Sequence, residues 1–302
     1  MSDIERKIFF YRIDCGSDAS GALLPFQHRQ VLAYLDTLDW NSLRLEDPTA
    51  PGDHFAIWHE RNRPDEVVFG RTRRSSLPRT EDGGRLTSLR LRDSAGIAEL
   101  IHVTFFPENI VGAEFNFFGP RIGKLAYFLM RQAVGICPEL HLGPLVKPDI
   151  QERLQRLEDL RIFDLVLDSS TVADVVRVAP DLGNALRQQI EFGGAGAVEL
   201  VLRRKPYSRD DTLSPDVLAT ARALAADPDV HDAARKFVVT GYDPQLDTVD
   251  EIDILNDSIM TTRRMLRLAD RERAVEANSA FNAIRDAYDE LRDDIGRAIA
   301  LR

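Results

Sequence analysis

Residues 98–118, A-E-L-I-H-V-T-F-F-P-E-N-I-V-G-A-E-F-N-F-F, decide the fold of the first half of the chain. Apolar and polar residues alternate on both sides of Pro107-Glu108-Asn109. This period of two predicts two half-buried antiparallel strands, with Asn109 in the left-handed conformation that a short connecting loop needs. The predicted register places Val103 opposite Ala113 and Phe105 opposite Val111 on a uniformly apolar face, and His102 opposite Glu114 on the other.

The segment that follows has the pattern of an amphipathic helix. Gly119-Pro120 is expected to start it, because proline suits the first helical position, where no backbone hydrogen bond is lost. Apolar residues then recur at helical spacing from Ile122 to Ala133. We expect this helix to lie on the apolar face of the hairpin and to form the core of the first half.

The remaining segments predict an α+β protein with mostly antiparallel sheets, helices packed on one face, and a long C-terminal helix. A second hairpin is expected on either side of residues 62–65, and residues 75–84 have the composition of a mobile loop. The proline-containing passage 140–148 is the expected boundary between an N-terminal domain, 1–145, and a C-terminal domain, 146–302. In the latter, the acidic residues between Asp243 and Asp257 do not match a calcium loop and are interpreted as a solvated strand edge.

The C-terminal helix is expected from about Arg271 to Ile299. Apolar residues fall at spacings of three and four through this segment, as in a heptad stripe. Packing on the sheet of its own domain is the favoured interpretation, and contact with a second copy is the alternative. A homo-oligomer is predicted on this basis, using either the stripe or the edge of a sheet.

Composition narrows the class of protein. The chain has 302 residues, 44% of them hydrophobic and 29% charged, which is typical of globular proteins. No apolar run approaches the roughly 20 residues that span a bilayer, and the charged N-terminus does not resemble a signal peptide. Two distant cysteines, Cys15 and Cys137, predict no disulfide framework, so we expect a cytoplasmic protein without membrane contact.

A local excess of arginine stands out against a net charge of −10. Residues 61–92 contain nine arginines and no lysine, against four acidic residues. Guanidinium groups bind phosphates bidentately and stack on bases, so this segment predicts a nucleic-acid or phosphate site. The candidate residues are Arg71, Arg73, Arg74 and Arg79. A solvated, arginine-rich face is the alternative interpretation.

A second candidate anion site lies at the expected start of the helix after the hairpin. Arg121 and Lys124 would place two cations in the first turn, where the helix dipole is already positive. An anion bound by Gly119, Arg121 and Lys124 would offset this cost. The alternative is that both side chains extend into water or meet nearby glutamates.

The sequence offers no strong catalytic motif. His102 and Glu114 could form an acid/base pair, although a salt-bridged surface histidine is the simpler interpretation. His54 and His59 would point to opposite faces of a strand, so no metal site is predicted, and no cofactor fingerprint is present. We therefore expect no catalytic residue, metal or cofactor.

Three segments resemble uncharacterised bacterial proteins of phage-defence gene clusters: K-I-F-F-Y-R-I near the N-terminus, F-V-V-T-G-Y-D, and V-D-E-I-D-I-L-N-D. The resemblance implies a bacterial cytoplasmic protein whose ligand is nucleic acid or a partner protein from the same cluster. Together with the arginines, it predicts an antiviral defence component that binds DNA or another nucleic acid without evident catalysis. A metal-dependent nuclease and an oligomeric scaffold for a partner protein are the alternatives.

Overall fold

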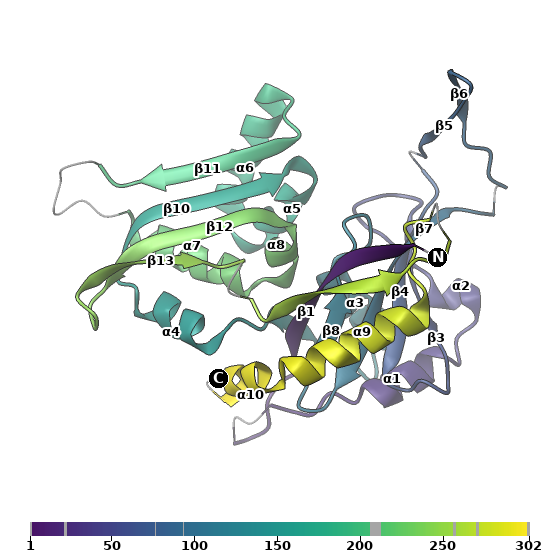
Figure 1. The fold of residues 1–302 in the computed structure, drawn as a ribbon, viewed down its shortest axis with the longest axis horizontal. Coiled ribbons are helices and arrows are strands. Elements are labelled where there is room, and N and C mark those ends of the chain that lie inside the picture. Colours follow the sequence, from purple (N-terminus) through teal and green to yellow (C-terminus); the bar gives the residue numbers. More distant parts are fainter. Residues whose placement is uncertain are drawn as a thin grey trace. The chain divides into compact units, whose positions relative to one another are not determined.

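The computed structural model of this protein describes residues 2–20, 23–75, 77–92, 94–205, 213–255, 258–269 and 272–300. The chain forms two compact units, each drawn in Figure 1 and described separately below. Unit 1 comprises Met1–Leu142 and Thr261–Asp289, and unit 2 comprises Gly143–Met260 and Glu290–Arg302. The expected division at residue 145 differs from this arrangement, because a strand and a helix from the C-terminal part return to unit 1.

Unit 1 is built on an eight-stranded sheet with the order β14-β1-β8-β7-β4-β3-β2, and β9 also pairs with β1. The pairings from β1 through β2 are antiparallel. The strands are β1 (Asp3–Asp14), β2 (Leu45–Glu46), β3 (His54–His59), β4 (Glu66–Arg73), β7 (Ile97–Phe106), β8 (Ile110–Glu114), β9 (His141–Pro144) and β14 (Met260–Leu266). The helices are α1 (His28–Leu35), α2 (Trp40–Leu43), α3 (Ile122–Gln132) and α9 (Ala277–Glu290). The predicted α+β class with antiparallel sheets is confirmed.

The central hairpin has the predicted register. Val103 pairs with Ala113 and Phe105 with Val111 across β7 and β8. Asn109 adopts a left-handed backbone conformation with φ of 60°, and Glu108 joins it with φ of 62°. The alternation of side chains therefore specifies both strands and the turn between them, because a shift of one residue would exchange the two faces.

Helices cover both faces of the unit 1 sheet. Phe128 of α3 packs against Phe69, whose strand neighbour Ile101 belongs to the predicted apolar face, so α3 lies where it was expected. On the opposite face, Phe281 of α9 meets the ring of His102 edge-on. The expectation of helices on one face is therefore wrong for unit 1. The polar face of the hairpin is covered, and its residues are buried rather than solvated.

The C-terminal segment forms two helices instead of one. Helix α9 ends at Glu290, and α10 (Arg292–Ala300) follows as part of unit 2. Figure 1 shows α9 in yellow lying across the sheet. Phe281 and Ile284, both in the expected stripe, are buried in unit 1. In α9 the stripe therefore packs on a sheet of its own chain, as the favoured interpretation expected, although that sheet belongs to unit 1 and not to the C-terminal half. The expected first residue, Arg271, lies outside the described residues.

The segment 75–84, expected to be a mobile loop, forms most of a further hairpin. Strands β5 (Arg79–Asp82) and β6 (Arg85–Ser88) pair with each other and project from the sheet between β4 and β7 (Figure 1). Gly83 and Gly84 connect them with φ of 57° and 82°. Two successive residues with positive φ form the tight turn that matches the twist of paired strands, which explains the hairpin.

Unit 2 has a four-stranded antiparallel sheet in the order β11-β10-β12-β13, with an apolar core between this sheet and its helices. The strands are β10 (Asp159–Asp168), β11 (Ala197–Arg203), β12 (Ala234–Asp243) and β13 (Thr248–Asp253). The helices besides α10 are α4 (Pro148–Arg156), α5 (Val172–Val178), α6 (Pro180–Gly193), α7 (Pro215–Ala226), α8 (Pro228–Ala233) and the short η1 (Ser169–Thr171).

The acidic segment of unit 2 is not simply a solvated edge. Asp243 is fully buried, and its carboxylate accepts a hydrogen bond from Nε of Arg156 at 2.8 Å. This bond holds the pKa of Asp243 below its usual value. Asp250 forms a bidentate pair with Arg153. The charges of these two carboxylates are therefore balanced by arginines of α4 within the same unit. Among the described residues, no helix is long and apolar enough to cross a membrane.

Candidate nucleic-acid interface

Two of the predicted arginines have structural roles. The guanidinium of Arg71 lies 2.9 Å from the carboxylate of Asp53 and 3.3 Å from that of Asp47, and both aspartates are buried. Arg74 donates from Nη2 to the carbonyl of Ser94 at 3.2 Å. A buried carboxylate requires such a partner, so Arg71 serves the fold.

The other two predicted arginines, Arg73 and Arg79, lie on either side of the base of the β5–β6 hairpin. Arg79 is exposed on β5. Arg73, at the end of β4, lines a cleft in unit 1 together with Pro78, the residue before β5. Arg73 therefore lies in a concave site, and Arg79 directly follows Pro78, a residue that lines the same site.

The predicted anion site at Gly119, Arg121 and Lys124 differs from the expectation. Helix α3 begins at Ile122, so Arg121 is its N-cap with an extended backbone, and Pro120 precedes the helix. The Arg121 guanidinium lies 4.9 Å from the centre of the Phe115 ring. Arg121 therefore stacks on an aromatic side chain at the N-cap position, and Lys124 lies in the first turn of α3.

The cleft that contains Arg73 has a volume of about 570 Å³ and is referred to below as the arginine cleft. Three arginines line it: Arg6 from β1, Arg73 from β4, and Arg273 from the segment before α9. Among the described residues, none of the three forms an ion pair with a carboxylate. Three carboxylates, Glu99, Glu114 and Glu272, also line the cleft. Segments distant in sequence thus bring three guanidinium groups to one concave surface.

Several polar atoms of the arginine cleft lack hydrogen-bond partners among the described residues. Nε of Arg6 and Nε of Arg73 are buried donors without an acceptor. The Nη2 of Arg6 donates to the carbonyl of Arg273 at 2.9 Å, which connects two of the arginines. Oε2 of Glu114 is a buried acceptor without a donor. Because buried polar atoms are usually satisfied, these three atoms point to a ligand with both acceptors and a donor.

His102 and Glu114 form the predicted cross-strand pair at the cleft. Nδ1 of His102 lies 2.6 Å from Oε1 of Glu114. Both residues are only 3% exposed, and α9 covers them from one side through Phe281. The interpretation of a surface histidine is therefore wrong, since this buried pair lines a cleft.

Exposed aromatic side chains lie beside the arginines. Phe117 and Phe118 are 51% and 46% exposed and contact each other edge-to-face. The guanidinium of Arg273 lies 3.9 Å from the centre of the Phe118 ring, and that of Arg121 lies 5.9 Å from Phe117. Alternating arginine and aromatic side chains offer both charge and flat surfaces, which is the combination that binds nucleic-acid strands.

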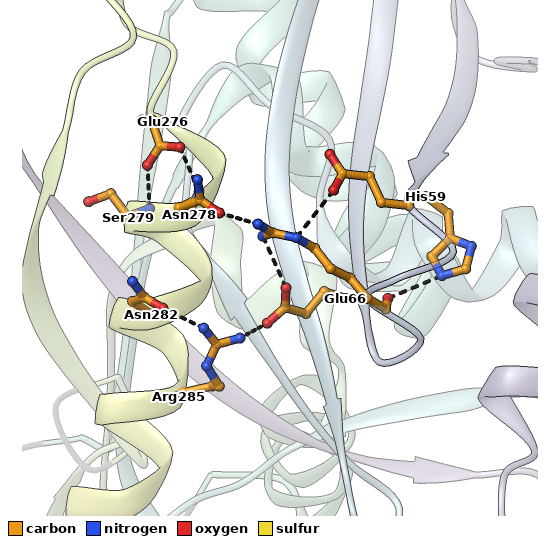
Figure 2. Close-up of polar contacts among 9 residues, drawn as sticks. His59, Glu66, Glu276, Asn278, Ser279, Asn282 and Arg285 are labelled. Carbon is orange, nitrogen blue, oxygen red and sulfur yellow. Dashed lines mark hydrogen bonds and ion pairs between the residues drawn. The ribbon is translucent and has the colours of Figure 1, made fainter.

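A charged cluster, called here the Glu66 clamp, anchors α9 on the sheet (Figure 2). Glu66 is buried at the start of β4 and pairs with Arg63 and with Arg285 of α9. Arg63 also contacts Asn278 of α9. The carboxylate of Glu276 caps the helix by accepting from the backbone of Asn278 and Ser279. The clamp fixes the helix whose preceding segment lines the arginine cleft.

A second cavity of about 480 Å³ lies next to the clamp. The exposed indoles of Trp40 and Trp58 line it and contact each other. Its histidine, His59, is bonded to the carboxylate of Asp36 at 2.9 Å and to the carbonyl of Arg63 at 3.2 Å. The polar groups here have partners within the protein, in contrast to those of the arginine cleft.

Sequence reasoning missed Arg6, Arg273 and the two exposed phenylalanines. Arg6 and Arg273 are isolated arginines in β1 and before α9, and only the topology of the sheet brings them to Arg73. Phe117 and Phe118 interrupt the alternation at the end of the hairpin, since both remain exposed. Two consecutive exposed aromatics after a strand were the available signal.

No protein-family model matches this chain, and no curated protein matches it either. Among the residues that the structure describes, no group of three or more histidine, cysteine, aspartate or glutamate side chains is arranged to hold a metal ion. The functional argument therefore depends on the geometry of the site itself.

Proposed function

We propose that this protein binds single-stranded nucleic acid through the arginine cleft and the Phe117–Phe118 pair. The observation that supports this most strongly is the convergence of Arg6, Arg73 and Arg273 in one cleft, without carboxylate partners among the described residues. Phosphates would accept from these guanidinium groups, and unpaired bases would stack on the exposed rings. A duplex hides its base faces, so the exposed phenylalanines favour a single strand.

The β5–β6 hairpin extends this surface. Arg79 and Arg85 are exposed on the hairpin, and Pro78 connects it directly to the cleft. Opposing charges are present, because Glu81 and Asp82 lie at its tip. The hairpin would contact the backbone of a strand that leaves the cleft, adding affinity without reading sequence.

The wider role that we propose is antiviral defence in a bacterium. This part of the proposal rests on the resemblance of three segments to proteins of phage-defence gene clusters. A homo-oligomer and a partner protein from the same cluster belong to the same proposal. Since the α9 stripe is buried, self-association would use a sheet edge, and light scattering would measure the molecular weight.

Binding is tested by fluorescence anisotropy with labelled ten-nucleotide RNA and DNA strands at low salt. Replacing Arg73 and Arg273 by serine should weaken binding on the order of 10- to 100-fold, since two charge-assisted contacts are lost. The matched control replaces Arg187 and Arg203, two exposed arginines of unit 2, by serine and removes the same charge. Equal losses in both variants, or no binding by the parent protein, would refute the proposal.

Two of the three carboxylates of the cleft, those other than Glu114, provide a test in the opposite direction. Glu99 and Glu272 should repel a phosphate bound by the three arginines. Replacing either glutamate by glutamine should strengthen binding by a few-fold at low salt and have less effect at high salt, because salt screens the repulsion. A weaker complex after this change would place the strand elsewhere.

Cleavage of the bound strand is a second candidate function, favoured by the position of one pair. His102 and Glu114 line the same cleft as the arginines, within reach of a strand bound there. A histidine oriented by a carboxylate can act as a general base. Incubating labelled RNA with the protein, with and without a chelator, distinguishes an enzyme from a binding protein and a metal-dependent reaction from a metal-independent one.

A further inference from the structure

We propose that the arginine cleft recognises the sugar hydroxyl of a ribonucleotide, so that RNA is bound in preference to DNA of the same sequence. This inference rests on the proposed function and names its ligand more closely. The inference rests on the observation that the cleft contains hydrogen-bond donors and one acceptor that lack partners among the described residues. A ligand that satisfies them must supply acceptors for the donors and a donor for the acceptor.

The donor side of the cleft fits a phosphate. Nε of Arg6 and Nε of Arg73 are buried and lack acceptors among the described residues, and the Arg273 guanidinium lines the same space. A phosphate group provides several acceptor oxygens and a negative charge. It satisfies these donors, but it cannot satisfy Glu114, because a carboxylate and a phosphate both accept and repel each other.

The acceptor side requires a hydrogen-bond donor. Glu114 is 3% exposed, so a partner for its Oε2 must enter through the cleft that this residue lines. The carboxylate is fixed, because Oε1 lies 2.6 Å from Nδ1 of His102. An acceptor buried without a partner is costly, and a donor from the ligand removes that cost. The bond therefore favours ligands that carry such a donor.

The geometry of the pair selects a single donor. Guanine presents two adjacent N–H groups, which need both oxygens of a carboxylate, and His102 already occupies one of them. A ribose hydroxyl is a single donor that lies a few bonds from a backbone phosphate. It is also the group by which proteins distinguish RNA from DNA. The amino groups of adenine and cytosine and the N3–H of uracil are the competing single donors, and the last is shared by ribo and deoxy strands of the same base.

Four uniform strands of ten nucleotides separate these possibilities. Uridine strands carry no exocyclic amino group, so oligouridine, its 2′-deoxy form and its 2′-O-methyl form differ only at the sugar. We expect the parent protein to bind oligouridine about 10- to 100-fold more tightly than the other two, as expected for one hydrogen bond to a charged group. Oligodeoxyadenosine should bind as weakly as the deoxyuridine strand, beyond differences in stacking.

A variant locates the preference at the buried pair. Replacing His102 and Glu114 together by leucine removes the acceptor, and apolar residues usually substitute for a buried ion pair without loss of fold. We expect the ratio of the affinities for oligouridine and for the deoxy strand to fall to about one, whatever the change in charge does to the affinity for both strands together. A retained sugar preference in this folded variant would overturn the inference.

The comparison on the parent protein decides the question even if the variant does not fold. Equal affinity for the ribo and deoxy strands would overturn the inference and leave the proposed binding function intact. A preference that follows adenine instead of the sugar would overturn it as well, and would assign Glu114 to a base. Binding of none of the strands would refute both proposals together.

Discussion

The arginines of the Glu66 clamp and those of the arginine cleft belong to the same unit but have opposite surroundings. Arg63 and Arg285 converge on a buried carboxylate, and they hold α9 on the sheet (Figure 2). Arg73 and Arg273 line a concave surface, and no described carboxylate pairs with them. The difference shows that the number of arginines in a segment does not identify a binding site. The partners that the fold supplies decide which arginines are available to a ligand.

The strongest test of the clamp is the removal of its carboxylate. Replacing Glu66 by alanine leaves two partly buried guanidinium groups without their shared partner, so we expect the free energy of unfolding to fall by about 2–4 kcal/mol. The control is Glu60→Ala, which removes a largely exposed partner of Arg63 and should cost at most about 1 kcal/mol. Urea denaturation measures both, and equal costs would contradict the role of the buried clamp.

Close packing against β8 also holds α9 on the sheet, independently of the charged clamp. A side chain at Gly112 of β8 would place its Cβ 2.9 Å from Ile284 of α9 and 2.9 Å from Phe10. We expect Gly112→Ala to lower the free energy of unfolding by about 1–3 kcal/mol, because the core must shift to admit the methyl group. Combining it with Ile284→Ala should cost less than the sum of the two single changes. Strict additivity in denaturant unfolding would show that α9 does not approach Gly112 closely.

A more exposed ion pair gives an intermediate case. Asp65 accepts a bidentate pair from Arg29 and a contact from His28, and the hydrogen bond from Arg29 is the main cause of its lowered pKa. Asp65→Asn should cost about 0.5–1 kcal/mol at neutral pH. A lowered folded-state pKa means that this stabilisation is present above the unfolded value of about 3.9 and is lost as the pH falls through the folded-state value. Thermal melts should show the difference between parent and variant disappearing below about pH 4, and a difference that grew in acid would contradict the assignment.

The smallest effect on stability is expected at the cleft. Arg73→Ala removes no ion pair among the described residues, so the free energy of unfolding should change by less than about 0.5 kcal/mol while the affinity for single strands falls. Calorimetry and anisotropy on the same sample measure both quantities. A loss of stability similar to that of Glu66→Ala would assign Arg73 to the fold and remove the contrast between the two regions.

The sequence predicted the parts of the fold that depend on local alternation. The register from Val103 to Ala113 and the left-handed Asn109 followed from side-chain spacing and turn chemistry. The cover over His102 was not predictable in this way, because α9 reaches it from a segment about 180 residues later in the chain. Contacts between residues so far apart in the chain cannot be derived from the spacing of residues within one segment.

The candidate site was predicted in part for the same reason. Arg73 belongs to the arginine-rich segment, and the His102–Glu114 pair follows from the register. Arg6 and Arg273 join them only through the order of strands in the sheet. Arg71 was predicted as a site residue because of its arginine neighbours in sequence. It instead forms ion pairs with Asp47 and Asp53, which belong to an earlier segment of the chain.

The salt dependence of binding tests most directly whether the cleft arginines contact phosphates. The logarithm of the affinity for a single strand falls with the logarithm of salt concentration by about 0.7 for each phosphate neutralised. A variant with Arg6, Arg73 and Arg273 replaced by serine should therefore show a slope smaller by about 2 than that of the parent protein. The same slope in both proteins, whatever the change in affinity, would show that these arginines do not bind the backbone and would contradict the account.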